Sequence, residues 1–234
     1  MGKRIVSQAR GHGSFTYRVR RRGYKVRIGY PEINVEGKAK IIKLISSAGH
    51  SAPIIKMQIG NKIFFNLAFQ GAYEGQEIEI NGKEIKMGNI TKLKDIAPGT
   101  KIYNIETVPG KGGKLIRSSG SFAEVSSSKD KNTLNVLLPS KKTKQFDGNC
   151  RATIGVIAGA GRLEKPILKA GKMFHMMKSK GRKWHFTSRV KVNAVDHPFG
   201  GGRGKRIKSK IAKRNAPPGR RVGHIRPSRT GRRK

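Results

Sequence analysis

An acid and a histidine stand side by side at Asp196 and His197, in the segment NAVDHPFGGGRG that spans residues 193–204. A histidine beside a carboxylate can act as a general base, because the carboxylate orients the imidazole ring and stabilises its charged form. The local sequence opposes that interpretation. Pro198 favours an extended backbone at His197, and neighbouring side chains of an extended chain point to opposite faces. Asp196 is therefore poorly placed to orient the ring.

No serine or cysteine nucleophile with its own base is recognisable near this pair, and Ser188 is only a loose candidate. Three roles for His197 stay open: a contact with RNA, which we favour, the stabilisation of a turn, and participation in chemistry. If the first holds, the glycines at 200–202 let the backbone follow an RNA surface, because no side chain blocks the approach. We predict no catalytic residue, with His197 the closest candidate, and no metal site or cofactor.

Two other glycine-rich segments resemble nucleotide-binding loops without matching them. In VIAGAGRLE, Glu164 stands where the pattern G-x-G-x-x-G requires its third glycine. In PGKGGKL, Val108 precedes the segment where G-x-x-x-x-G-K-[ST] begins with glycine, and Leu115 replaces the final Ser or Thr. These mismatches argue against a dinucleotide-binding enzyme and a nucleoside triphosphatase. Both segments still offer backbone that can approach a phosphate closely.

The charge of the chain is large and unevenly placed. In 234 residues, 52 Lys and Arg outnumber 13 Asp and Glu, which gives a formal net charge of +39. Residues 1–31 carry +9, residues 32–150 carry +7 and residues 151–234 carry +23. Two basic ends around a nearly balanced middle indicate a folded body with arms that bind a polyanion. Nucleic acid is the first candidate.

Other classes of protein fit the sequence less well. A membrane surface would also attract basic arms, but we find no amphipathic helix with a broad apolar face and no lipidation signal. The N-terminus lacks the apolar core of a secretory signal, and no run approaches the roughly 18 apolar residues of a membrane span. Cys150, the single cysteine, excludes an internal disulfide and a cysteine-cluster zinc site. We expect it to be buried at the start of a strand in a cytoplasmic protein without membrane contact.

Short runs of β-branched and aromatic residues fill the middle of the chain, separated by Gly, Asn, Pro and Ser. Gly60-Asn61 is a two-residue hairpin turn, and 130–132 is a second expected turn. Strands this short and numerous, without helices between them, argue against a doubly wound sheet and favour two small barrels with a boundary near 88–92. The expected strands are 41–46, 54–59, 62–69 and 77–80 in a first group and 100–106, 121–127, 133–138 and 150–158 in a second.

One helix is expected over 165–180, where apolar residues recur at roughly helical spacing and indicate a stripe that packs on a core. The segment from Lys165 onward has 23 basic residues, one acid and too few apolar residues for a core of its own, so we expect it to order on its partner. The stripe consists of Ile167, Leu168, Met173, Phe174 and Met177. The expected domains are a basic extension at 1–31, barrels at 32–90 and 91–165, and a short helix with a basic extension at 166–234.

RNA suits this chain better than DNA. The basic residues lack a helix-turn-helix or zinc-finger pattern that would dock in a major groove. They are interleaved with Gly, Pro and single rings that can stack on unpaired bases of irregular RNA. The rings are Tyr17, Tyr24, Phe174, Trp184, Phe186 and Phe199.

Three long segments, in order, resemble the archaeal form of the universal large-subunit ribosomal protein two family. They are ETVPGKGGKLIRSSG at 106–120, RATIGVIAGAGRLEKPILKAGK at 151–172 and NAVDHPFGGGRGK at 193–205. The likeness covers nearly the whole chain. Phe199 stands where bacterial members carry a second histidine, which resembles the archaeal and eukaryotic branch. Ala194 departs from the usual proline of the third segment.

The resemblance implies a mainly β fold, in which an oligonucleotide-binding (OB) barrel is followed by an SH3-like barrel with long basic extensions at both ends. It also implies binding to large-subunit ribosomal RNA and neighbouring ribosomal proteins, contacts with small-subunit RNA and transfer RNA, and location in the large ribosomal subunit. Roles in subunit association, transfer RNA binding and the peptidyl-transferase centre follow from the same resemblance.

We expect the RNA contacts to be made mostly with phosphates, which position a protein without specifying sequence. The expected RNA-binding residues are Lys3, Arg4, Arg10, Arg18, Arg20, Arg21, Arg22, Arg27, Arg117, Arg162, Lys169, Lys172, Arg182, Lys183, Trp184, Arg189, His197, Gly200, Gly201, Gly202, Arg203, Lys205, Arg206, Arg214, Arg220 and Arg221.

Two rival functions stay open on the sequence alone. A non-ribosomal basic protein that compacts RNA or DNA would share the charge, but it should bind a duplex of any sequence without preference for structured RNA. An RNA-processing hydrolase could use Asp196 and His197, or a metal held by Glu74, Glu77 and Glu79. The strand pattern assigns this acidic trio to a solvated face instead.

Overall fold

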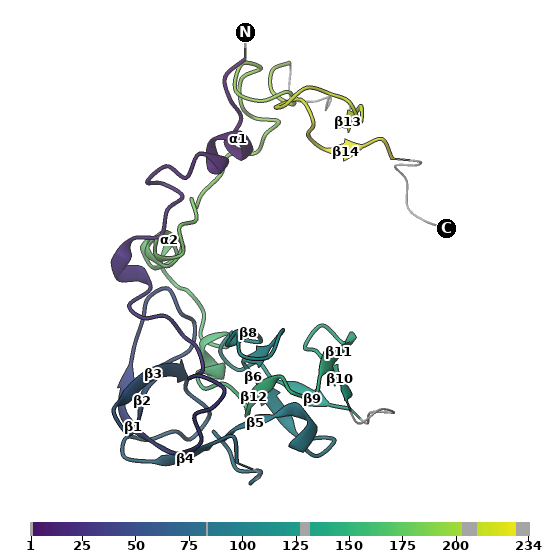
Figure 1. Cartoon of the computed structure of the whole chain (residues 1–234). Coiled ribbons are helices and arrows are strands. Elements are labelled where there is room, and N and C mark those ends of the chain that lie inside the picture. Colours follow the sequence, from purple (N-terminus) through teal and green to yellow (C-terminus); the bar gives the residue numbers. More distant parts are fainter. Residues whose placement is uncertain (1, 83, 127–131, 203–209, 228–234) are drawn as a thin grey trace. The chain divides into compact units, whose positions relative to one another are not determined.

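A computed structural model describes residues 2–82, 84–126, 132–202 and 210–227, with the side chain of Arg22 outside this description. The chain forms two compact units. We call Arg20–Leu168 the core unit, and Met1–Val19 together with Lys169–Lys234 the terminal unit. Figure 1 labels most of their helices and strands.

Among the described residues, the core unit contains a ten-stranded sheet in the order β11-β10-β9-β6-β12-β5-β4-β1-β2-β3. A separate antiparallel pair, β7 with β8, accompanies it. Short 3-10 turns lie at Arg21–Gly23, Leu93–Asp95 and Ala160–Arg162. The strands are β1 Gly37–Ile45, β2 Ile54–Ile59, β3 Lys62–Leu67, β4 Glu77–Ile80, β5 Ile90–Lys92, β6 Lys101–Tyr103, β7 Ile105–Glu106, β8 Gly113–Leu115, β9 Ala123–Val125, β10 Thr133–Leu137, β11 Thr143–Asp147 and β12 Arg151–Ile154.

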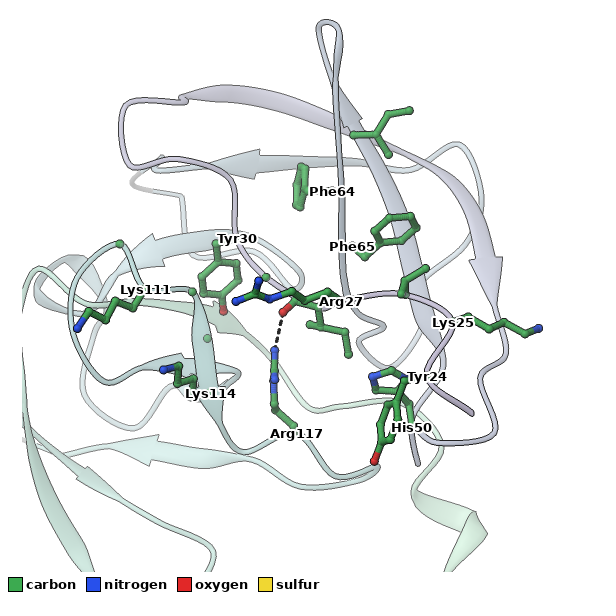
Figure 2. Close-up of a pocket in the computed structure, with 17 residues that line it drawn as sticks. Tyr24, Lys25, Arg27, Tyr30, His50, Phe64, Phe65, Lys111, Lys114 and Arg117 are labelled. Atoms are coloured by element: carbon green, nitrogen blue, oxygen red, sulfur yellow. Dashed lines mark hydrogen bonds between the residues drawn. The ribbon is translucent and has the colours of Figure 1, made fainter. Parts of the chain in front are cut away.

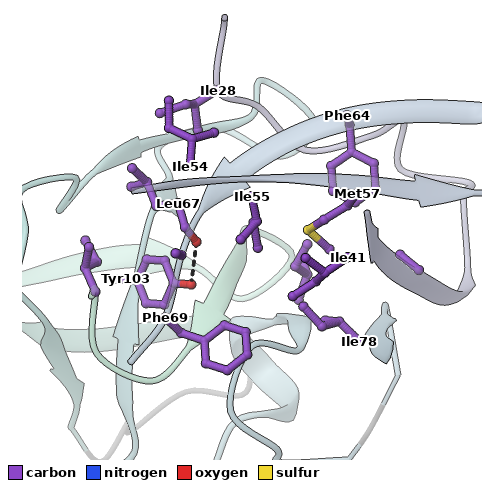
Figure 3. Close-up of a cluster of buried hydrophobic side chains, with 14 of the residues drawn as sticks. Ile28, Ile41, Ile54, Ile55, Met57, Phe64, Leu67, Phe69, Ile78 and Tyr103 are labelled. Atoms are coloured by element: carbon purple, nitrogen blue, oxygen red, sulfur yellow. Dashed lines mark hydrogen bonds between the residues drawn. The ribbon is translucent and has the colours of Figure 1, made fainter. Parts of the chain in front are cut away.

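Strands β1 to β4 surround a first hydrophobic core. Burial alternates along β1, where Ala39 and Ile41 are buried between exposed lysines, because successive side chains of a strand face opposite sides. The predicted hairpin turn is confirmed: Ile59 lies opposite Lys62, and Gly60 takes the positive φ of 52° that a tight turn of this kind needs. Figure 3 shows the packing of this first core.

Strands β5, β6 and β9 to β12 surround a second core. β12 lies between β5 and β6, so all four of its residues are buried, including the charged Arg151. Cys150 directly precedes β12 and is fully buried, as predicted. Burial, with a smaller contribution from Asp147, raises the pKa of its thiol to about 11.

The two cores belong to one continuous sheet. β4 and β5 pair in parallel through Ile80 and Ile90, and an isolated bridge joins Phe69 to Ile157. The hydroxyl of Tyr103 donates to the backbone oxygen of Leu67 at 3.0 Å (Figure 3). The predicted mainly β class is confirmed, and two separate cores are what two successive barrels require. The domain boundaries near 31, 90 and 165 stay predictions.

The sequence located the strands better than their ends. The expected strand at 100–106 is divided between β6 and β7 at Asn104, whose φ is 51°. Strand β5 was not expected, because it lies where the boundary near 88–92 was placed. Strands β8 and β11 were not expected either, because the segments GKL and TKQFD contain few apolar residues. The second expected turn, at 130–132, lies mostly outside the described residues.

The expected helix forms over a shorter range, α2 Ala170–Ser179. Pro166 disfavours helical backbone at Lys165, the first residue of the expected range, and the helix begins only after Lys169, whose backbone is extended (φ −122°, ψ 136°). It ends before Gly181, whose φ is 64°. The expectation that its apolar stripe packs on a core is wrong. No residue of α2 is buried, and Ile167 and Leu168, 48% and 82% exposed, lie outside the helix.

The terminal unit holds little further regular structure among its described residues. A six-residue helix, α1 Val6–Gly11, was not expected from the sequence. β13 Ile211–Ala212 and β14 His224–Ile225 form a short parallel pair. None of the helices that the structure describes is long and apolar enough to cross a membrane.

Candidate RNA-binding surfaces

A pocket of about 790 Å³ opens in the core unit. Its walls are the segment Tyr24–Tyr30, part of β3, the start of β8 and the loop between β7 and β8, which we call the glycine loop (residues 107–112). Asp and Glu are absent from the residues that line it. The lining includes five cationic side chains: Lys25, Arg27, Lys111, Lys114 and Arg117.

Figure 2 shows how these cations are distributed: Lys111 and Lys114 lie on one side of the pocket, Tyr24 and His50 on the other, and Arg117 between them. The lysines come from the glycine loop and β8, which follows it. Neither lysine has a carboxylate partner among the ion pairs of the described residues. Cations without counter-charges attract an anion of matching size.

Aromatic rings form the opposite side of the pocket. Tyr24 is 47% exposed and contacts His50 edge to face, with ring centroids 4.8 Å apart. Phe64 and Tyr30 also line the pocket, but Phe64 is mostly buried in the first core. Tyr24 is therefore the ring with most free surface for stacking on a base.

His50 is neutral at physiological pH and has a defined tautomer. The hydroxyl of Ser47 donates to the backbone oxygen of Gly23 at 3.0 Å, so its oxygen accepts from Nδ1 of His50, 2.9 Å away. That bond leaves Nε2 as the acceptor. Burial, assisted by the charge of Arg117, lowers the pKa of the His50 ring below its usual value.

Arg117, a predicted RNA contact, also holds the pocket together. It donates to the backbone oxygen of Ile28 at 2.8 Å (Figure 2) and to Oδ1 of Asn104 at 3.0 Å. Burial lowers its pKa from the ordinary arginine value. Nε and Nη2 of Arg117 thus each donate a hydrogen bond within the protein, while the side chain also lines the pocket.

The buried carboxylate of Glu106 accepts hydrogen bonds from two backbone amides of the glycine loop. Oε1 of Glu106 accepts from Nη2 of Arg151 at 3.1 Å and from the amide of Gly112 at 3.0 Å. Oε2 accepts from the backbone amides of Arg151, at 2.9 Å, and Gly110, at 3.3 Å. Both charged side chains are fully buried, with exposed fractions of 1% or less.

Glu106 and Arg151 were not predicted as site residues. A signal was present: Glu106 is the one acid between Asp95 and Glu124, and Arg151 interrupts the apolar run CRATIGVIA. A charge inside a predicted strand requires a partner. The sequence could not identify that partner, because the two residues lie 45 positions apart.

Next to the pair of Glu106 and Arg151, neutral polar side chains form further hydrogen bonds toward the first core. The Tyr30 hydroxyl donates to the backbone oxygen of Asn104 and is bonded to Oγ1 of Thr153, both at 2.7 Å. Asn66 joins them through Thr153 at 3.1 Å and Asn104 at 2.8 Å. Burial raises the pKa of Tyr30 far above its usual value, so its hydroxyl keeps its proton.

In the terminal unit, His197 lines a smaller cavity of about 250 Å³. Two predicted RNA contacts, Arg10 and Arg189, line the same cavity together with Phe186. The guanidinium of Arg189 lies over the Phe186 ring, 5.5 Å from its centroid. The structure therefore brings three of the predicted residues to one place.

His197 is buried and held by its own turn. Its Nδ1 accepts from the backbone amide of Phe199 at 3.1 Å, and the two rings meet edge to face with centroids 4.9 Å apart. The backbone oxygen of His197 accepts from Gly200 at 2.9 Å. Burial, with a smaller contribution from Arg189, lowers the pKa of the ring. His197 is thus a neutral side chain whose Nε2 carries the proton.

Asp196 does not orient this ring. Its carboxylate lies 3.7 Å from the ammonium of Lys3, and no hydrogen bond joins it to His197 among those of the described residues. The turn-stabilising role of His197 has direct geometric support, whereas the RNA-contact role stays a prediction. A catalytic Asp-His pair does not form here.

The three glycines of this motif differ from one another. A side chain at Gly200 would collide with the backbone oxygens of Asn193 and Val192, and Gly201 has a φ of 77°. Packing within the turn therefore explains these two glycines without RNA. Gly202 has no atoms within 4 Å of a Cβ position, but its φ of 83° also favours glycine, so the backbone conformation explains it without RNA.

Most of the other predicted contacts are exposed cations of the terminal unit and of the start of the core unit. Arg162 is the most constrained, because its Nε donates to the hydroxyl of Ser119 at 3.0 Å. Trp184 is half-buried, with its ring edge to face against His185. Arg203, Lys205 and Arg206 lie outside the described residues, as does the side chain of Arg22.

The acidic trio of β4 and the turn before it does not form a metal site. Glu74 accepts from the backbone amide of Leu44 at 2.8 Å, and Glu77 lies 4.0 Å from the ammonium of Lys38. Within the described ranges, no group of three or more His, Cys, Asp or Glu side chains could hold a metal ion.

Comparison with known proteins gives a consistent result over the whole chain. The family model described as "Ribosomal Proteins L2, C-terminal domain" matches residues 86–219. The large ribosomal subunit protein uL2 of Archaeoglobus fulgidus is 46% identical, over 99% of both chains. The proteins of the same name from Methanococcus maripaludis and Methanocaldococcus jannaschii are each 44% identical, over the full length of both chains.

Proposed function

Because the chain belongs to the family of the large ribosomal subunit protein uL2, we propose that it is a structural constituent of the large subunit that binds ribosomal RNA. One observation carries the RNA-binding role: five cations, with no Asp or Glu among them, line the core-unit pocket. Such a pocket suits the phosphates of a folded RNA.

The two sides of the pocket are suited to different parts of an RNA. Lys111 and Lys114 supply charge for phosphates, and Tyr24 supplies a partly exposed ring for an unpaired base. His50, with Nε2 as its acceptor, can receive a hydrogen bond from a base edge or a ribose 2′-hydroxyl. These features favour irregular RNA over a regular DNA duplex.

The terminal unit extends this interaction by charge. Its exposed Lys and Arg neutralise further phosphates, and the cavity that His197 lines together with Arg10 and Arg189 offers the Nε2–H of His197 as a donor. We propose that His197 positions RNA and takes no part in chemistry, because within the described ranges Asp196 pairs with Lys3 and no carboxylate is bonded to the His197 ring. The family resemblance supports roles of the assembled protein in subunit association, transfer RNA binding and the peptidyl-transferase centre.

The paired change Lys111→Ala/Lys114→Ala tests the pocket. Binding of the full-length protein to a transcript of archaeal large-subunit ribosomal RNA is measured from low to moderate salt. If both lysines contact phosphates, the log–log salt slope falls by about 1.4 to 1.8, since each contact contributes about 0.7 to 0.9. Lys38→Ala/Lys40→Ala, on the exposed side of β1, removes equal charge outside the pocket. Equal losses in both variants would reject the pocket as the binding site.

Competition and incubation separate the rival functions. Duplex DNA of arbitrary sequence should displace the ribosomal RNA transcript poorly, whereas efficient displacement would favour a DNA-compacting protein. Labelled RNA incubated with the protein and Mg²⁺ should stay intact, and specific cleavage would favour a hydrolase. Sedimentation of the tagged protein with large subunits tests its place in the ribosome.

A further inference from the structure

The ion pair between Glu106 and Arg151 lies at an unusual place for two charges. Among the ion pairs of the described residues it alone is buried, whereas the other three are at the surface. Replacing a buried ion pair by apolar residues of similar volume is often neutral or stabilising, so stability alone does not explain such a pair. Its contacts indicate another role.

The carboxylate of Glu106 is bonded to the glycine loop, which forms one wall of the core-unit pocket. Its two oxygens accept the amides of Gly112 and Gly110, at 3.0 and 3.3 Å, so they fix the middle of the glycine loop. Lys111 lies between these two glycines, and Lys114 follows in β8. A side chain at Gly113, the first residue of β8, would overlap the backbone oxygen of Asn104, so the chain that follows the loop lies directly against the connection between β6 and β7.

The guanidinium of Arg151 holds the opposite wall. Its Nη2 donates to the backbone oxygen of Pro31 at 2.9 Å, and its Nη1 donates to that of Glu32 at 3.3 Å. The same group lies over the ring of Tyr30, 5.3 Å from the centroid. Tyr30 ends the segment Tyr24–Tyr30, which contributes Lys25 and Arg27 to the pocket lining, and Pro31 and Glu32 directly follow it.

We propose that Glu106 and Arg151 are a positioning pair that sets the distance between the two walls of the pocket and so pre-organises its cations for RNA. The inference rests on the proposed RNA-binding function of this pocket. Neither side chain is exposed enough to touch RNA. The pair acts through Lys111 and Lys114 on one side and through Lys25 and Arg27 on the other.

The test replaces both charges together, as Glu106→Leu/Arg151→Met, because removal of one partner would leave the other buried without compensation. We expect the full-length double variant to keep its far-UV circular dichroism spectrum. Its affinity for the ribosomal RNA transcript should fall about tenfold, because the loop and its lysines must then be ordered on binding. Unchanged affinity and salt slope in a folded double variant would overturn the proposal.

Glu106→Asp decides the matter if the double variant does not fold. The shorter carboxylate keeps a negative charge beside Arg151 but cannot reach both glycine amides, so we expect the variant to fold and to lose about threefold in affinity. Amide hydrogen exchange reports the tether without RNA: the amides of Gly110 and Gly112 should be protected in the wild-type protein and exchange faster in this variant. Equal protection in both proteins would contradict a tethering role.

A double-mutant cycle distinguishes positioning from general stabilisation. In the Lys111→Ala/Lys114→Ala background, replacement of the ion pair should change affinity less than in the wild-type background, because the loop then has no charge to position. Equal effects in both backgrounds would mean that the pair acts by some other route. If the lysine changes themselves leave affinity unchanged, the proposed pocket fails, and the exchange experiment still reports the tether.

Discussion

The core unit and the terminal unit each contain 26 Lys and Arg, but the core unit has 12 Asp and Glu, whereas the terminal unit has one, Asp196. They also differ in what they bury. The two hydrophobic cores lie in the core unit, whereas Ile5 and Ala212 are the buried apolar side chains described in the terminal unit. The two units thus carry equal numbers of cationic side chains but differ in the number of acids and in the amount of buried apolar surface.

This difference indicates two ways of presenting positive charge to RNA. In the core unit, Glu106 fixes the backbone around Lys111, so the surface that we propose for RNA binding is formed by the protein alone. In the terminal unit, repulsion among cations opposes compaction and little apolar burial offsets it. We therefore expect the core unit to fold alone and the terminal unit to depend on RNA.

Removal of the C-terminal part of the terminal unit should have the largest effect. A chain that ends at Leu168 loses 22 Lys and Arg. If six to ten of them contact phosphates, the salt slope of RNA binding should flatten by about 0.7 to 0.9 per contact, with an affinity loss of about 10³-fold or more at low salt. Filter binding across salt concentrations measures both quantities. An unchanged slope would show that the core unit is the main RNA anchor.

Shortening one isoleucine in each unit compares their packing directly. Ile55→Ala in the first core should lower the free energy of unfolding by about 2 to 5 kcal/mol, because it leaves a cavity among buried side chains. Ile211→Ala, at a position that is 58% exposed in the terminal unit, should change it by less than about 0.5 kcal/mol. Urea unfolding followed by far-UV circular dichroism measures both. Comparable losses would place a second cooperative core in the terminal unit.

Brief trypsin treatment of the RNA-free protein should remove the terminal unit at least about 100-fold faster than it cleaves the core unit, because local opening of a segment without a core costs little free energy. Mass spectrometry of the resistant fragment also locates its N-terminal end. Burial of Ile28 predicts an end near residue 20, before the boundary at 31 that charge alone suggested. Added ribosomal RNA should protect the tails. Equal resistance of both units without RNA would contradict the comparison.

The change His197→Gln should have a small effect on chemistry, because glutamine keeps hydrogen-bonding capacity but cannot carry the proton. Large subunits reconstituted with this variant, and purified as fully assembled particles, should transfer peptide in single turnover at near-normal rates from pH 6 to 8.5. A general base would instead contribute about 10²- to 10⁴-fold and a titration near neutral pH. A loss of that size in particles with intact RNA would assign His197 a chemical role.

Acid should weaken the terminal unit slightly through the same residue. The pKa of His197 is lowered in the folded chain, so the unfolded chain takes up a proton first as the pH falls below about 6.5. The contribution of this ring to stability is therefore present above pH 6.5 and is lost as the pH falls through the folded pKa. Proton NMR of the ring should give a midpoint below 6.5. A midpoint above that value would contradict the buried, neutral state.

The strands around the first core were predictable, because β-branched runs and the turn at Gly60-Asn61 are local signals. The site was predictable only in part. Arg27 and Arg117 were expected to bind RNA, but Lys25, Lys111 and Lys114 were not. Their meeting in one pocket depends on contacts between residues far apart in sequence, which a single sequence does not reveal.

The hydrogen-bond partners of the residues within the motifs were least predictable. The sequence identified His197, but its bond to the Phe199 amide depends on a turn whose shape Gly200 and Gly201 determine. Similarly, the motif around 106–120 suggested close backbone approach to phosphate, whereas Gly110 and Gly112 direct their amides to Glu106. The carboxylate occupies those donors, so the lysines are left to attract the anion.

The place of β12 in the sheet has a consequence for how the protein is made. This strand lies between β5 and β6, and Ile157, which follows it, packs in the first core and forms a bridge to Phe69. Until about two thirds of the chain has been synthesised, β5 and β6 therefore each lack one neighbouring strand, the second core lacks β12 and the first core lacks Ile157. Exposed strand edges and incomplete cores favour aggregation. We expect the nascent chain to need protection during that interval, and both cores to be completed together once the segment around Ile157 has left the exit tunnel.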